Sequence, residues 1–352
     1  MRGGPGLRRP AAVVGLAALA LAIVPGVTGI SAAQGGSPYP VPWTFLAAIP
    51  AGAQDGPDVP PPGTTPDGKD CTATPEVTHP RPVILVHGLG GDENTNWQTM
   101  SPWLADHGYC VYALTYGNNP NASPGFDRFG GLSDMTTSAA VLADFVQSVR
   151  SWTGAAKVDI VGHSEGGTMP DWYLKFDGGW KYVDHFVAIS GVLHGTSFWG
   201  LGDLYALGQS NGGSQQFAQA FSQYCQSCTE FLPSSPWMTA LDSTDPAAGP
   251  GNAATVCPSD GAAVAGVAYT SIATDNDELV RPPTSDFIDA SCNGVNGISV
   301  DDILLQAQCP TDQADHISVA ADPVVAQDLL NALDPANAHG VRCPAIVLPA
   351  IG

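Results

Sequence analysis

The stretch that decides the fold is Val158-Asp159-Ile160-Val161-Gly162-His163-Ser164-Glu165-Gly166-Gly167. A short β-branched run leads into a Gly-x-Ser-x-Gly pattern. In a tight turn from a strand into a helix, glycine at the two flanking positions removes side chains that would collide with neighbouring backbone. The turn lifts the Ser164 hydroxyl off the end of the sheet. We therefore predict that Ser164 is a nucleophile; the alternative is a structural turn in a glycine-rich chain.

Strands and helices alternate on both sides of this stretch. Apolar runs indicate strands at 82–86, 109–116, 185–190, 266–273 and 303–308, and helical spacing or flanking context predicts helices at 97–105, 137–153, 166–175 and 323–333. This alternation predicts an α/β fold with a mostly parallel central sheet and helices on both faces. Residues 191–264 interrupt the alternation. We interpret them as a partial cap over the site; plain surface packing is the alternative.

The N-terminal residues read as a secretory signal peptide. Arginines precede an apolar run, small residues at 31–33 fit a cleavage position, and Pro25 and Gly26 interrupt the run. Because the run ends before about 20 apolar residues, we favour removal of residues 1–33 over anchoring in a membrane. Residues 34–81 are rich in Pro and Gly and are expected to form an extended arm. The ordered domain is expected at 82–352.

Export would place the eight cysteines in an oxidising compartment, so we expect disulfides. Cys225-x-x-Cys228 could instead hold zinc, but no second Cys pair or His pair stands at ligand spacing. The net charge of −21 disfavours nucleic acid and anionic membrane surfaces as partners, since both require Lys/Arg clusters. These features indicate an extracellular protein without stable membrane insertion that acts on neutral substrates. We expect a monomer, although no feature of the sequence fixes the oligomeric state.

A serine nucleophile needs an imidazole to take its proton and a carboxylate to orient that imidazole. In a parallel α/β sheet all three follow the C-terminal ends of strands, in the chain order Ser, Asp or Glu, His. His316 stands between a predicted strand and the final helix, where this base is expected, whereas His194 precedes every suitable acid. For the acid we choose Asp277, with Asp275 second. A solvated turn residue is the alternative for each.

The strand at 82–86 ends in His87-Gly88-Leu89-Gly90-Gly91. A turn so rich in glycine leaves backbone N–H groups free to face a ligand. We expect the N–H groups of Leu89 and Glu165 to form an oxyanion hole. The alternative for Leu89 is an ordinary turn between a strand and a helix. This chemistry requires no metal and no organic cofactor.

Several motifs occur together: His87 to Gly91, Asn96-Trp97-Gln98-Thr99, Gly108 to Gly117, Gly162 to Gly167 with Pro170, and Asp315-His316. Over about residues 39–343 they resemble the secreted actinobacterial class 2 lipases and esterases. The resemblance implies an α/β-hydrolase fold and hydrolysis of carboxylic esters such as acylglycerols. The substrate would be a small-molecule or lipid ester, with at most transient contact with a lipid interface.

The resemblance also bears on individual residues. That group's Thr-x-x-Asp-Glu pattern falls on Thr274, Asp277 and Glu278, which supports Asp277 over Asp275. It implies a disulfide between Cys71 and Cys110. The sequence departs from the group at Glu165, where such enzymes often carry Gln or Met.

We therefore predict a secreted triacylglycerol lipase or carboxylesterase that forms an acyl-enzyme on Ser164. An acyltransferase or a cutinase-like polyester hydrolase would use the same triad, and a catalytically inactive binding module is the alternative from another class. If the Glu165 carboxylate lies near the site, it would favour a protonated His316. On that premise, Glu165→Gln would move the acid limb of the pH–rate profile downward.

Overall fold

The computed structural model describes residues 38–45, 47, 59–118, 129–197, 225–245, 247–250, 254–344 and 349–350. The predicted signal peptide lies outside these residues. So do residues 198–224, which hold the apolar stretches of the predicted cap. No helix in the described ranges combines the length and apolar character of a membrane span.

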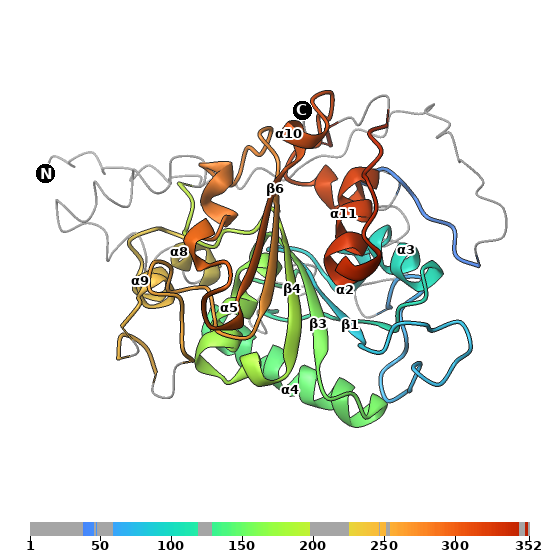
Figure 1. The fold of residues 1–352 in the computed structure, drawn as a ribbon, viewed down its shortest axis with the longest axis horizontal. Helices are drawn as coiled ribbons and strands as arrows, with labels where there is room; N and C mark the ends of the chain where they lie inside the picture. The colour runs from blue at the N-terminus through green and yellow to red at the C-terminus, as the bar shows by residue number, and fades with distance from the viewer. Residues whose placement is uncertain are drawn as a thin grey trace, which may run out of the picture. The chain divides into compact units, whose positions relative to one another are not determined.

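A parallel sheet forms the centre of the described fold (Figure 1), with strand order β2-β1-β3-β4-β5-β6. The strands are β1 Val83–Val86, β2 Val111–Leu114, β3 Val158–His163, β4 Val183–Ile189, β5 Ala268–Ala273 and β6 Ser299–Leu304. Alternate β1 residues face opposite sides, so Ile84 and Val86 join one apolar cluster and Val83 and Leu85 the other. Burial on both faces explains the continuous apolar runs.

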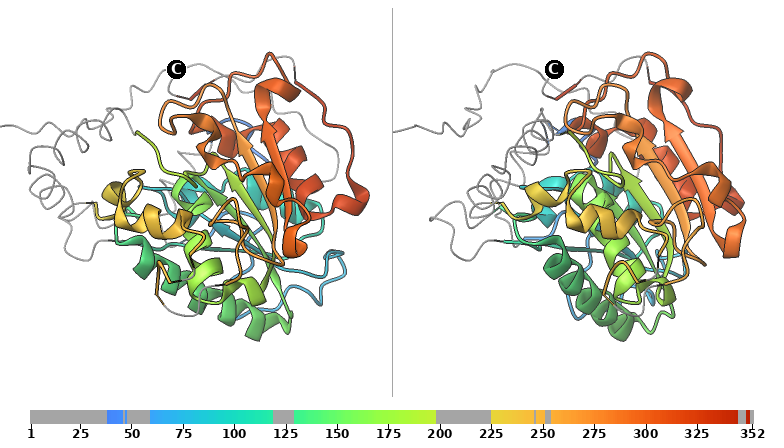
Figure 2. Two further views of the ribbon diagram at one scale, coloured as in Figure 1. Left: turned by 60° about the vertical axis from the view of Figure 1, so that its left-hand side comes forward. Right: turned by 90° about the vertical axis from the view of Figure 1, so that its left-hand side faces the viewer.

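Helices cover both faces of the sheet (Figure 2). One face packs against α4 Met135–Thr153, α5 Met169–Phe176 and α9 Pro236–Asp242; the other packs against α3 Met100–Asp106 and α11 Pro323–Leu333. The shorter elements are α2 Glu93–Asn96, α8 Ser227–Glu230, α10 Leu305–Gln308, and the 3₁₀ turns η1 Ser164–Gly167, η2 Gly179–Lys181, η3 Pro283–Asp286, η4 Ala290–Cys292, η5 Val295–Gly297, η6 Ser318–Ala321 and η7 Pro335–Asn337. The predicted α/β-hydrolase architecture is confirmed.

The crossover helix α4 shows how the local sequence sets its ends. Asp134 caps the N-terminus by accepting a hydrogen bond from the Thr137 N–H at 2.9 Å. Gly154 ends the helix in the left-handed region, with φ of 70°. Buried residues recur every three or four positions between these caps. The helix therefore begins two residues before the predicted start and ends at the predicted residue.

The helix predicted at 97–105 is α3, which starts three residues later at Met100, and two further predicted elements differ in kind from the structure. The strand predicted at 303–308 is β6, which starts earlier at Ser299 and ends at Leu304, and residues Leu305–Gln308 form α10. β6 is an edge strand with partly exposed, polar residues, so a search for apolar runs misses its start. The helix predicted at 166–175 is divided into η1 and α5, because the chain turns sharply at the serine.

The described part of the N-terminal arm contacts the domain along its length. Trp43 packs edge-on against Trp103 with ring centroids 5.0 Å apart, and the Thr99 hydroxyl donates to the Pro42 carbonyl at 2.6 Å. Farther along, the Thr65 N–H donates to the Val111 carbonyl at 2.7 Å. The arm thus lies against α3 and beside the start of β2.

The cysteines form four disulfides: Cys71–Cys110, Cys225–Cys228, Cys257–Cys292 and Cys309–Cys343. The Cys71–Cys110 pairing confirms the resemblance-based prediction and ties the arm to the residue before β2. Because Cys225 and Cys228 bond to each other, these sulfurs are not free thiolate ligands for zinc. The prediction of disulfides is confirmed.

Candidate active site

Ser164 begins η1 directly after β3, with φ of 56° in the left-handed region. The flanking glycines are required by close backbone contacts. A Cβ atom on Gly162 would lie 1.6 Å from the Gly166 carbonyl oxygen, and one on Gly166 would lie 2.0 Å from the Val86 carbonyl oxygen. No side chain fits at either position. The turn is held in this strained conformation by β1 and β3 together, as expected at a functional site.

Three predicted side chains come together at the C-terminal ends of the strands. Ser164 follows β3, Asp277 lies in the turn after β5, and His316 lies in the loop between α10 and η6. His316 Nε2 is 2.8 Å from Ser164 Oγ, and His316 Nδ1 is 2.8 Å from Asp277 Oδ2. Both His316 and Asp277 are buried. This is the geometry in which an imidazole can remove the serine proton.

Asp277 is held as a carboxylate by its surroundings. Its Oδ1 accepts hydrogen bonds from the N–H groups of Leu279 at 2.9 Å and Val280 at 2.7 Å, while Oδ2 faces His316. Burial alone would raise the pKa of Asp277, but these hydrogen bonds and the His316 charge hold it below its usual value. Asp275 is exposed and does not join the cluster. The structure brings together the first choice and not the second.

Two residues that the sequence did not assign to the site connect its parts. His163 Nε2 lies 2.8 Å from the His316 carbonyl oxygen, and His163 Nδ1 lies 3.1 Å from Asn96 Oδ1. The same Asn96 oxygen accepts a hydrogen bond from the Gly88 N–H at 3.1 Å. Burial lowers the pKa of His163 to about 3, so its ring is uncharged near neutral pH. The single N–H of the neutral ring, placed on Nε2, donates to the His316 carbonyl and ties the His316 loop to the end of β3, while Asn96 is bonded to the turn after β1 through Gly88.

We call Gly88–Gly91 the oxyanion turn. A Cβ atom on Gly88 would lie 3.0 Å from the Ser164 Cβ, so this turn passes directly beside the serine. Among the hydrogen bonds of the described residues, none uses the Leu89 N–H. The Glu165 N–H belongs to the first turn of η1, where N–H groups have no partner within the helix. Both predicted donors are therefore available beside Ser164.

The Glu165 side chain leaves the site and enters the interior, where it is 0% exposed. Burial raises the pKa of this carboxyl well above its usual value, and the nearby Glu230 raises it further. Burial therefore disfavours the charged form of Glu165. The predicted downward shift of the acid limb required a carboxyl near the site, and this buried position behind Gly131 gives that premise no support.

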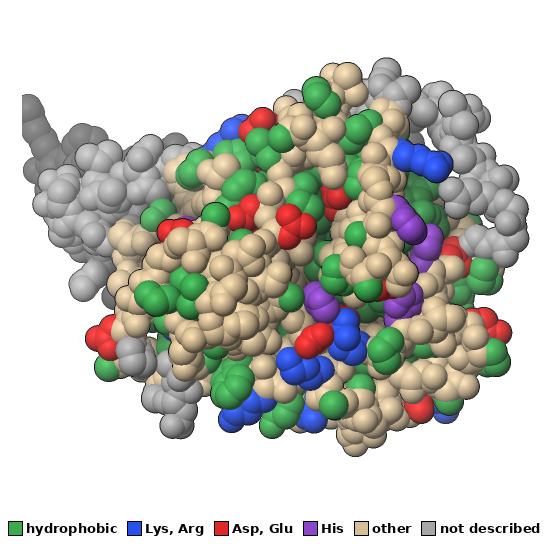
Figure 3. All heavy atoms as spheres, viewed as in Figure 1, with side chains coloured by type: hydrophobic (Ala, Val, Ile, Leu, Met, Phe, Trp, Pro, Cys, Tyr) green, Lys and Arg blue, Asp and Glu red, His purple; other side chains and the backbone are tan. Residues whose placement is uncertain are grey.

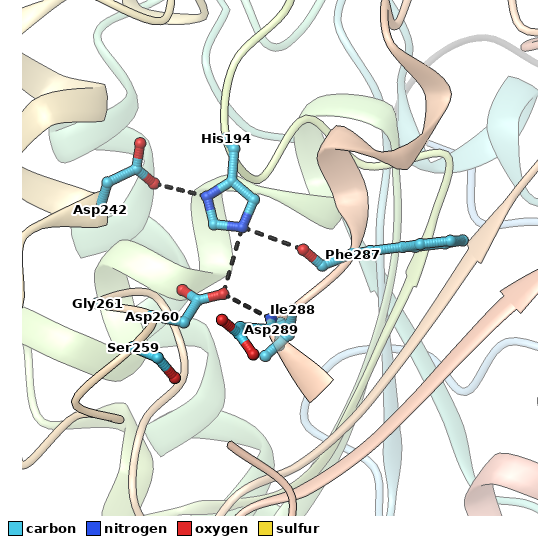
Figure 4. Close-up of a pocket in the computed structure, with 8 residues that line it drawn as sticks. All are labelled: His194, Asp242, Ser259, Asp260, Gly261, Phe287, Ile288 and Asp289. Atoms are coloured by element: carbon cyan, nitrogen blue, oxygen red, sulfur yellow. Dashed lines mark hydrogen bonds and ion pairs between the residues drawn. The ribbon is translucent and has the colours of Figure 1, made fainter. Parts of the chain in front are cut away.

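A second set of polar side chains lines a cavity of about 510 Å³ (Figure 4). His194 Nδ1 is 2.8 Å from Asp242 Oδ1, and its Nε2 is 3.1 Å from the Phe287 carbonyl oxygen and 3.4 Å from Asp260 Oδ2. Burial would lower the pKa of His194, but hydrogen bonds and ion pairs with the two carboxylates raise it to about 10. A ring that donates from both nitrogens cannot accept a serine proton. His194 is an ion-paired imidazolium rather than a general base.

In the part of the chain that the structure describes, one cluster has metal-ligand geometry: Asp159, Asp184 and His185. These carboxylates already pair with cations. Arg81 Nε lies 2.9 Å from Asp159, and Lys157 Nζ lies 3.1 Å from Asp184. The cluster is at the N-terminal ends of β3 and β4, at the opposite end of the sheet from Ser164. We assign it an ion-pairing role.

The surface charge agrees with the acidic composition. On the face shown in Figure 3, the described Lys and Arg side chains are few, and Asp, Glu and His side chains interrupt their main group. This face offers no continuous basic surface for a polyanion.

Residues 80–264, more than half of the chain, match the class 2 lipase family. Triacylglycerol lipases from Pseudarthrobacter phenanthrenivorans and Burkholderia plantarii are each 36% identical over 91 residues. That segment is 24% of this chain and 25% and 23% of the two relatives, so the match spans about a quarter of their length.

Among solved structures, Aspergillus fumigatus lipase B superposes with a TM-score of 0.51 at 19% identity, covering 82% of this chain and 63% of that one. At this identity the likeness supports the fold alone. Sequence match and fold agree: the chain belongs to the class 2 lipase family of α/β-hydrolases.

Proposed function

We propose that this protein is a serine carboxylic ester hydrolase, a lipase or carboxylesterase, with Ser164, His316 and Asp277 as its catalytic triad. The observation that carries the proposal is the pair of 2.8 Å contacts that His316 makes, through Nε2 to Ser164 and through Nδ1 to Asp277. Membership of the class 2 lipase family supports the reaction class.

The proposed reaction has two steps. His316 Nε2 removes the Ser164 proton as Oγ attacks the ester carbonyl carbon, and Asp277 stabilises the resulting imidazolium. The Leu89 and Glu165 N–H groups donate hydrogen bonds to the oxyanion of the tetrahedral intermediate. Collapse of this intermediate breaks the C–O bond, and His316 returns the proton to the departing alcohol. Water, activated by His316, then releases the carboxylic acid from Ser164.

The proposed substrates are neutral esters such as acylglycerols. The two curated relatives are triacylglycerol lipases, which supports this class. We also propose that the protein is secreted. Four disulfides support that proposal, because such bonds persist in oxidising compartments outside the cytosol.

Labelling with a fluorophosphonate tests the proposal, because the probe reacts with a serine that a neighbouring base activates. We expect wild-type protein to be labelled at Ser164 and to hydrolyse p-nitrophenyl butyrate. Ser164→Ala should abolish labelling and lower kcat by a factor on the order of 10⁶, since triad members act as a unit. Labelling that persists in the Ser164→Ala variant, or a folded wild-type protein that resists the probe, would refute the assignment.

Adding an alcohol acceptor to the same assay separates hydrolysis from acyl transfer. A hydrolase yields mainly the free acid, whereas an acyltransferase yields mainly the new ester. A parallel assay on insoluble polyester tests the cutinase-like alternative.

A further inference from the structure

The Glu165 carboxyl lies directly behind the oxyanion turn. A Cβ atom built on Gly131 would lie 3.0 Å from the Leu89 Cα and 3.2 Å from Glu165 Oε2. Gly131 therefore lies between the backbone of the turn and the Glu165 carboxyl. Its φ of 68° and its lack of a side chain permit this close arrangement.

The same segment holds the oxyanion turn by hydrogen bonds. The Gly90 N–H donates to the Gly130 carbonyl at 2.9 Å, and the Gly130 N–H donates to the Gly91 carbonyl at 2.8 Å. On its other side, the Gly131 N–H donates to the Tyr116 carbonyl at 2.8 Å. A displacement of Gly130 or Gly131 would therefore also displace the turn that carries the Leu89 N–H.

The hydroxyl groups next to the carboxyl are those of Tyr116 and Ser227. Both hydroxyls donate hydrogen bonds to backbone carbonyls: Tyr116 donates to His87 at 2.8 Å, and Ser227 donates to Gly131 at 2.6 Å. Neither Glu165 oxygen accepts a hydrogen bond among the described residues. Burial, which raises the Glu165 pKa, is a larger cause than hydrogen bonding from these two hydroxyls, which would lower the pKa.

The described titratable groups near the Glu165 carboxyl would not neutralise a negative charge on it. Glu230, from α8, faces it as a second acid, and its own pKa is raised to about 9 by burial and by Asp134 at the α4 N-terminus. His87 stacks on Tyr116 and is uncharged, because burial lowers its pKa to about 4. No cation is among the described groups that act on Glu165.

We propose that Glu165 is a positioning residue for the oxyanion turn: its carboxyl supports Gly131, and a negative charge on this buried, unpaired group displaces the turn and ends catalysis. The proposal rests on the proposed ester hydrolase function. Ionisation leaves a buried, unpaired charge, which can be relieved only by movement of the surrounding segments or by entry of water. Since Gly130 and Gly131 are bonded to the turn, that movement reaches the Leu89 N–H.

The test compares pH–rate profiles of wild type and Glu165→Gln on p-nitrophenyl butyrate. The amide has the shape of the acid, donates a hydrogen bond and stays uncharged. We expect Glu165→Gln to keep most of the wild-type kcat at neutral pH. Above the Glu165 pKa, wild-type kcat should fall about tenfold per pH unit, while the variant keeps its activity there. An alkaline limb that is the same in both would overturn the proposal.

Glu230→Gln is the matched control, because it removes the second acid that acts on the Glu165 carboxyl, a partly buried one. We expect its alkaline limb to remain, with at most a small displacement. If the limb disappears in Glu230→Gln and persists in Glu165→Gln, Glu230 is the titrating group and our assignment is wrong.

A ¹³C NMR titration of the Glu165 carboxyl carbon, assigned by difference from Glu165→Gln or from selectively labelled wild type, gives a readout independent of activity. We expect it to stay protonated through neutral pH; a titration in the ordinary range of glutamate would overturn the proposal even if the variant does not fold. Absence of ester hydrolysis by the wild type would instead refute the proposed function, while the titration would still report the state of Glu165.

Discussion

The side chain of His163 contacts the main chain of His316: His163 Nε2 lies 2.8 Å from the His316 carbonyl oxygen. The contact joins the residue before the nucleophile to the loop that carries the base. It fixes the backbone of His316 rather than its ring, so we expect His163 to position the proposed base.

Replacing His163 by alanine should therefore lower kcat more than it changes KM. A base displaced by about 1 Å costs on the order of 10²-fold in rate, because proton transfer depends on alignment. Steady-state kinetics on p-nitrophenyl butyrate measure this split. His339→Ala, at an exposed histidine, is the control and should behave as wild type. A folded His163→Ala protein with normal kcat would show that the contact is dispensable.

Asp277→Asn tests the orienting role of the acid. The amide oxygen can still accept hydrogen bonds from Leu279 and Val280, but the amide NH₂ then faces His316 Nδ1. This arrangement favours the tautomer that already carries a proton on Nε2 and cannot take one from Ser164. We expect kcat to fall by about 10⁴ with little change in KM.

Asp275→Asn is the matched variant two residues away, at an exposed carboxyl. Its kinetics should equal those of the wild type. Equal losses in both variants would mean that the turn, rather than the Asp277 carboxylate, is responsible.

The proximity of Ser164, Asp277 and His316 was predictable because each position depends on local pattern and chain order, while their catalytic roles stay a proposal. Ser164 lies in a strand–turn–helix motif, and Asp277 and His316 follow strands in the order that a parallel sheet requires. The start of β6 was not predictable in this way, since an edge strand with one exposed side need not be apolar.

Contacts between segments that are far apart in the chain could not be predicted from the sequence. The state of Glu165 depends on Tyr116 after β2 and on Ser227 in α8, and neither approach is visible in any spacing. The Cys257–Cys292 and Cys309–Cys343 pairings were likewise open, because cysteine spacing alone does not fix connectivity.

Gly166→Ala should prevent formation of the nucleophile turn. The added Cβ would lie 2.0 Å from the Val86 carbonyl oxygen, and backbone at the centre of the sheet cannot move aside without breaking β1–β3 pairing. We expect loss of fluorophosphonate labelling and a free energy of unfolding lower by about 3 kcal/mol or more. Gly340→Ala, where a Cβ meets nothing within 4 Å, should leave both unchanged. An active Gly166→Ala enzyme would contradict the steric argument.

His194 should make stability depend on pH. Its folded-state pKa of about 10 exceeds the ordinary value of 6.5, so protonation favours the folded state. The contribution is complete below pH 6.5 and is lost as pH rises through 10. His194→Gln removes the charge and leaves Asp260, which is almost fully buried, without its cation. We expect the variant to be less stable by about 2 kcal/mol below pH 6.5, a typical value for hydrogen bonds to charged groups.

Urea denaturation of wild type and His194→Gln at several pH values from 5 to 10 measures this difference. The gap in free energy of unfolding should narrow steadily above pH 6.5, because the wild-type imidazolium becomes neutral while glutamine does not titrate. His339→Gln, at an exposed histidine, should show no such narrowing. If the difference in free energy of unfolding stays constant from pH 5 to 10, His194 stabilises the folded state by packing and neutral hydrogen bonds. The carboxylates of Asp242 and Asp260 then do not hold it as an imidazolium.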